Sequence, residues 1–173
     1  MIMKKILFSL IALMAVMTVQ AQSICGTWRS VQPIVSTQEA GSLSIKNWTF
    51  TFNEDGTFST VIEVAMSIEP EPMVALDITF SLDVSGTYTL DGDQLTSTPN
   101  HDTYKLEVQS ASMNGVVIED PSVIKNLESV LNGPSFKVNL FSMTSTVKVT
   151  DQMIEVIQNG KTMQLMRLST IKN

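Results

Sequence analysis

The side chains that most often carry catalysis are scarce in this chain. His101 is its only histidine, and it lies in Pro99-Asn100-His101-Asp102, a segment with the composition of a turn. A Ser-His-Asp or Cys-His arrangement would need a nucleophile that converges on His101 from a distant strand. Zinc would need several His or Cys ligands, and the chain has one of each. We therefore predict a protein that is not an enzyme, with no metal and no cofactor.

Acidic residues at predicted turns are the next candidates for chemistry. Asp91-Gly92-Asp93 and Asn53-Glu54-Asp55-Gly56 carry the hard oxygen ligands that calcium prefers. Neither segment has the spacing of a dedicated calcium loop, and hairpin geometry alone explains Asp-Gly sequences. Glu69 and Glu71 flank prolines in a predicted loop, and nothing in the sequence indicates the cleft that a glycosidase acid and base require. We expect these residues to form turns.

Cys25 is the single cysteine of the chain. Its thiol is free, pairs with another chain, or is the acylated first residue of a lipoprotein. Acylation needs small residues just before the cysteine, and Gln22-Ser23-Ile24 ends in a branched side chain. We therefore do not expect lipoprotein anchoring through Cys25, and we favour a small apolar side chain beside the first strand.

The amino-terminal residues have the pattern of a secretion signal. Residues 1–5 form a short basic segment, and residues 6–19 form an apolar segment without a charge. Val19-Gln20-Ala21 has the small or modest side chains that a signal peptidase needs at its cleavage site. We predict a signal peptide over residues 1–21 and one domain over residues 22–173. No later stretch approaches the roughly 20 apolar residues of a membrane helix. The predicted location is therefore outside the cytoplasm, periplasmic or extracellular.

The charge balance bears on possible partners. The chain has 11 basic and 17 acidic side chains, a net charge of −6, and its basic residues do not cluster. An acidic surface repels phosphates. We therefore exclude nucleic acid as a partner.

The elements that must position any site are mostly strands, because apolar and polar residues alternate with a period of two. Turn residues such as Asn53 to Gly56, Asp91 to Asp93 and Asn159-Gly160 separate the alternating segments. A helical period occurs once, near residues 121–132, between a capping Asp120 and Asn132-Gly133-Pro134. The expected strands, eight or nine in all, begin at Gly26 and include residues 48–52, 58–68, 78–84, 94–98, 104–109, 136–149, 153–158 and 161–169.

Sequential hairpins of this number either split into a sandwich or curl into a barrel, and the pattern leaves both open. Three sequence segments indicate a family: Gly26-Thr27-Trp28-Arg29, the predicted hairpin from Phe50 to Phe58, and the predicted hairpin from Gly86 to Thr96. With them the chain resembles the lipocalin-like secreted proteins of Bacteroidetes-type bacteria over most of residues 25–169. The resemblance implies an all-β, up-and-down antiparallel barrel. It also implies that Trp28 closes one end of the barrel, with Arg167 of the last strand over the indole, and this implication extends to Gly26.

The apolar interior is the remaining candidate for function. A packed core and a hollow pocket both account for its residues, and methionines such as Met66, Met143, Met163 and Met166 favour an adaptable lining. We predict non-catalytic binding of a small hydrophobic ligand, and the alternative is an envelope interaction module with a filled core. The predicted lining residues are Phe58, Ile62, Val64, Met66, Ile78, Phe80, Leu82, Phe136, Val138 and Leu140.

Overall fold

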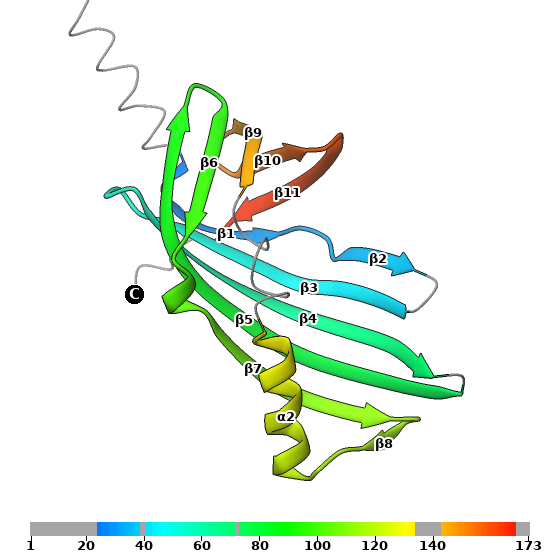
Figure 1. Cartoon of the computed structure of the whole chain (residues 1–173). Coiled ribbons are helices and arrows are strands. Elements are labelled where there is room, and N and C mark those ends of the chain that lie inside the picture. Colours follow the sequence, from blue (N-terminus) through cyan, green and yellow to red (C-terminus); the bar gives the residue numbers. More distant parts are fainter. Residues whose placement is uncertain (1–23, 39–40, 72, 134–142, 169–173) are drawn as a thin grey trace, which may run out of the picture.

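The computed structural model describes residues 24–38, 41–71, 73–133 and 143–168 (Figure 1). The predicted signal peptide lies outside them. Strands dominate these residues, together with one α-helix, α2, and one 3-10 turn, η1. The elements are β1 (Gly26–Ser30), β2 (Ile34–Gln38), β3 (Gly41–Phe52), β4 (Thr57–Glu71), β5 (Val74–Asp91), β6 (Gln94–Pro99), η1 (His101–Thr103), β7 (Lys105–Met113), β8 (Val116–Val117), α2 (Pro121–Leu131), β9 (Met143–Val149), β10 (Met153–Gln158) and β11 (Lys161–Arg167).

Eight of the strands close into an antiparallel barrel. In chain order they are β1, β3, β4, β5, β6, β9, β10 and β11, and each pairs with the next. The last strand returns to the first, with Trp28 opposite Arg167 in the β1–β11 ladder. In the closed part, each of the eight strands has a partner on both sides, so this part has no free edge. The predicted all-β, up-and-down barrel is therefore confirmed.

Three further strands extend the barrel into an open sheet. β3 pairs with β1 over residues 49–52 and with β2 over residues 41–45. β5 likewise pairs with β6 over residues 86–91 and with β7 over residues 76–83, and the short β8 follows β7. The long strands β3, β4 and β5 run through both parts, as Figure 1 shows. The strands therefore outnumber the eight or nine expected, because one edge of a long strand serves two partners.

The helix predicted near residues 121–132 is present as α2. Asp120 caps it, because its Oδ1 accepts a hydrogen bond of 2.8 Å from the Ser122 amide. At the other end the Asn132 amide donates to the Glu128 carbonyl. Leu131 is buried against the open sheet. Among the described residues, no helix is long and apolar enough to cross a membrane.

The apolar side chains form two clusters that follow this division. The first fills the closed barrel and consists of Ile24, Trp28, Phe50, Phe52, Phe58, Tyr88, Leu95, Val147, Ile154, Val156 and Leu165. The second lies on the open sheet under α2 and consists of Ile62, Val64, Ile78, Phe80, Leu82, Val84, Val108 and Leu131. Partly buried Trp48 packs against both clusters. The molecule thus has two small cores that meet at Trp48.

Candidate functional site

One end of the barrel is closed by Trp28 and Arg167. The indole of Trp28 is fully buried, and its Nε1 donates to the Ile24 carbonyl at 2.7 Å. The Arg167 guanidinium carbon lies 4.1 Å from the indole ring centroid, which is the stacking implied by the resemblance. Arg167 also donates from Nη1 to the Cys25 carbonyl at 2.9 Å and from Nε to the Asp151 carbonyl at 2.7 Å. The guanidinium therefore ties the residues before β1 to the β9–β10 turn.

Gly26 makes this arrangement possible. Its φ of +127° is one that side chains rarely adopt, and a Cβ built on it would lie 2.7 Å from Arg167 Nη1. Glycine leaves that space to the guanidinium. The structure thus brings together all three residues that the sequence linked to barrel closure.

Cys25 lies beside the same closed end. Its Sγ is 3.5 Å from the Tyr88 hydroxyl, which donates to the Asn53 carbonyl at 2.8 Å. The thiol is half-buried. Burial, followed by the hydrogen bond to Cys25, raises the pKa of Tyr88. Cys25 is thus part of the packing before β1, as a small apolar side chain beside the first strand would be.

A cavity of about 660 Å³ lies at the opposite end of the barrel. Along β11, Arg167 belongs to the closed end, Leu165 to the barrel core, and Met163 and Lys161 to the cavity wall. The wall comes from the β1–β2 connection, β3, the start of β9 and the β10–β11 hairpin. Its residues are Val31, Gln32, Pro33, Ile34, Ile45, Trp48, Met143, Val156, Gln158, Asn159, Lys161, Thr162, Met163 and Gln164.

Trp48 is the most firmly positioned part of this wall. Its Nε1 donates to Thr60 Oγ1 at 2.8 Å, and its amide donates to Ser30 Oγ at 3.1 Å. Its ring stacks on Phe50, with centroids 5.0 Å apart and planes inclined by 24°. The apolar side chains of Met143 and Met163 also line the cavity. The arrangement provides a rigid aromatic surface beside flexible thioethers.

The rim of the cavity is polar. Gln158 and Lys161 are opposite each other in the β10–β11 ladder, joined by a turn in which Asn159 and Gly160 both have positive φ. Among the described residues that line the cavity, Lys161 is the only charged one. In the described part of the chain no acidic side chain forms an ion pair with it. The cavity therefore has an apolar interior and a positively charged rim.

Seven of the ten predicted lining residues are described, and they lie away from this cavity. Phe58 is buried in the barrel core, Met66 packs against the second cluster, and five others are buried in that cluster: Ile62, Val64, Ile78, Phe80 and Leu82. Phe136, Val138 and Leu140 lie outside the described residues. Period-two alternation marks the inward face of a strand, but it does not say which inward residues pack together and which border a hollow. That the predicted residues bind a ligand stays a prediction.

Met143 and Met163 are the two cavity residues for which the sequence held a signal, since their adaptable side chains favoured a lining. Trp48, Val156 and Lys161 were missed, because nothing in their spacing separates them from other strand residues. His101 lies in η1 and is exposed.

Within the described ranges, no group of three or more His, Cys, Asp or Glu side chains could hold a metal ion. No protein-family model and no curated protein matches the chain. The cavity at the Trp48 end is therefore the candidate site, on the evidence of its geometry.

Proposed function

We propose that the protein is an exported, lipocalin-like carrier that binds a small hydrophobic ligand in the cavity beside Trp48. The observation that carries the proposal is the cavity itself. Its volume of about 660 Å³ falls in the range of roughly 300 to 1,000 Å³ typical of small-molecule sites. Export is supported by the basic and apolar pattern of residues 1–21.

The position of the cavity also favours a ligand. The closed end is fixed by Trp28 and Arg167, so the barrel opens toward Trp48, Met143 and Met163. An apolar molecule placed there would remove these side chains from water, at about 25 cal/mol for each Å² of apolar surface buried. Binding there would leave the barrel core intact.

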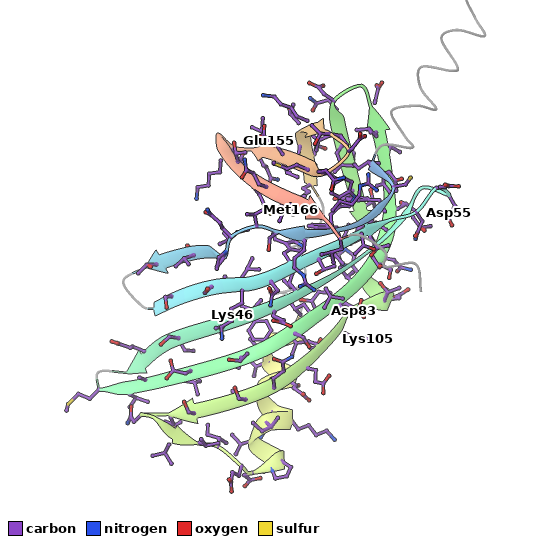
Figure 2. The ribbon with its side chains drawn as sticks, turned by 180° about the vertical axis from the view of Figure 1, so that it is seen from behind. Lys46, Asp55, Asp83, Lys105, Glu155 and Met166 are labelled. Carbon is purple, nitrogen blue, oxygen red and sulfur yellow. The ribbon has the colours of Figure 1, made fainter. Side chains whose placement is uncertain are left out.

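The first test is extraction. The protein, purified without detergent, is denatured, extracted with organic solvent and examined by mass spectrometry for a co-purified hydrophobic molecule. Met163→Trp should abolish the co-purification, because the larger side chain would occupy the cavity. Met166→Trp is the matched control, since Met166 lies on the same strand, is 53% exposed and carries a label in Figure 2. Equal recovery from both variants would contradict the proposal.

A second candidate, an envelope interaction module, is favoured by one observation. Exposed apolar side chains gather on the β7–β8 hairpin, where Met113, Val116 and Val117 are 47%, 71% and 65% exposed. Surfaces of this kind often mark contacts with other proteins. Crosslinking in the native cell envelope tests it. A partner that is lost in the double variant Val116→Asp and Val117→Asp would favour it, and a free monomer would not.

A further inference from the structure

We propose that the ligand is an anionic amphiphile, with Lys161 and Gln158 at its head group and its tail against Trp48, Val156 and Met163. This inference rests on the proposed function, because it names the class of molecule that the same cavity takes.

The charge of the lining favours an anion. The chain as a whole has a net charge of −6, yet the part of the cavity wall that the structure describes contains one basic residue and no acidic one. The Lys161 ammonium would attract a carboxylate, sulfate or phosphate, and it would repel an amine. A neutral hydrocarbon would leave the ammonium and the Gln158 amide without a partner other than water.

The order of residues along the hairpin favours a ligand that is polar at one end only. Residues two apart share a face of a strand. On β11 that face runs from exposed Lys161 through half-buried Met163 to buried Leu165. On β10 it runs from exposed Gln158 through Val156 to fully buried Ile154. Both strands therefore change from polar to apolar in the same direction, from the rim toward the barrel core.

Because Lys161 is exposed, its contribution to the affinity for the ligand should be small. Its side chain can lay an apolar stem along the wall while the ammonium stays hydrated. Ion pairs at exposed positions are weak, so the pair with a head group should contribute about two- to five-fold in affinity. Most of the binding energy would come from the tail.

The experiment compares three probes that share one tail: dodecanoic acid, dodecanol and dodecylamine. Each is titrated into the purified, delipidated protein while the combined fluorescence of Trp28 and Trp48 is followed, and the change is expected from Trp48, which lines the cavity. The protein should bind the acid about two- to five-fold more tightly than the alcohol, and the amine most weakly. Lys161→Gln should remove the preference for the acid, and Lys161→Glu should shift the preference to the amine. Lys148→Gln, at an exposed position of β9, which pairs with β10, should keep the preference of the natural protein.

The outcomes separate the two proposals. Equal affinity for the acid and the alcohol, or a preference for the acid that survives Lys161→Gln, would overturn the anionic head group and leave the hydrophobic carrier in place. Failure of all three probes to bind would count against the carrier as well. Lys161 is exposed, so these variants should melt at the same temperature as the natural protein, and Lys161→Gln alone decides the question if Lys161→Glu does not fold.

Discussion

Trp28 and Arg167 are partners in the β1–β11 ladder, and the Arg167 guanidinium also lies over the Trp28 indole, 4.1 Å from its ring centroid. One pair of residues thus joins the first and last strands of the barrel twice, through the backbone and through the side chains. The cavity lies at the other end of the same strands. Substitutions at the closed end should therefore lower stability without weakening ligand binding.

The first prediction concerns Trp28→Ala. The indole is fully buried, so its loss should lower the free energy of unfolding by about 3–5 kcal/mol, as measured by urea denaturation. Affinity of the folded protein for dodecanoic acid, measured by isothermal titration calorimetry, should stay unchanged. Trp48→Ala is the comparison, because Trp48 lines the cavity and its loss should weaken binding. An unchanged melting temperature in Trp28→Ala would show that the pair does not hold the barrel closed.

The second prediction concerns Gly26→Ala. The added Cβ would meet Arg167 Nη1 at 2.7 Å on a backbone with φ of +127°, so we expect a loss of about 1–3 kcal/mol in unfolding free energy. Part of the loss should come from displacing the guanidinium. The same substitution should therefore cost less when Arg167→Gln is already present, and a double-mutant cycle measures that difference. Strict additivity would mean that backbone strain alone matters at Gly26.

The residue pattern was sufficient for the strands and the helix for physical reasons, but it left a sandwich and a barrel open, and only the resemblance favoured the barrel. Alternation and turn residues locate strands, and Asp120 with Asn132-Gly133 brackets the one helix. The double pairing of β3 and β5 was not predictable. A long segment of alternating residues has the same sequence pattern whether one edge of the strand pairs with one partner strand or with two. The lengths of the partner strands decide where the barrel ends.

The site was harder to predict than the fold. Phe80 and Leu82 have the same inward-facing pattern as Val156 and Met163, yet the first two are buried in a packed cluster and the others border the cavity. The difference arises beyond Ser30, where β2 pairs with β3 and the start of β11, residues 161–164, pairs with β10. It is a consequence of tertiary arrangement, and local residue types do not encode it.

The third prediction concerns alkaline pH. Burial raises the pKa of Tyr104 from its ordinary value of 10.0 to about 12, because the neutral phenol is favoured in the folded protein. Its contribution to stability is complete below pH 10 and is lost as the pH rises toward 12. Tyr104→Phe cannot ionise, so its unfolding free energy should fall less than that of the natural protein over this interval. Urea denaturation at several pH values measures the difference, and parallel curves would contradict the assignment.

The fourth prediction compares two buried hydroxyls of the barrel. Thr60 is 1% exposed, accepts a hydrogen bond from Trp48 Nε1 at 2.8 Å and donates to the Thr49 carbonyl at 2.9 Å. Ser145 is 2% exposed, and its hydroxyl has no hydrogen-bond partner among the residues that the structure describes.

These partners decide the cost of removing each hydroxyl. Thr60→Val keeps the shape of the side chain but leaves the indole N–H of Trp48 without its acceptor, so unfolding free energy should fall by about 1–3 kcal/mol. It should also loosen the ring that lines the cavity and weaken binding of dodecanoic acid. Ser145→Ala removes a hydroxyl that forms no bond, so its effect on stability should stay within about 1 kcal/mol. Equal losses in the two variants would mean that the hydrogen bond to Trp48 does not position the cavity wall.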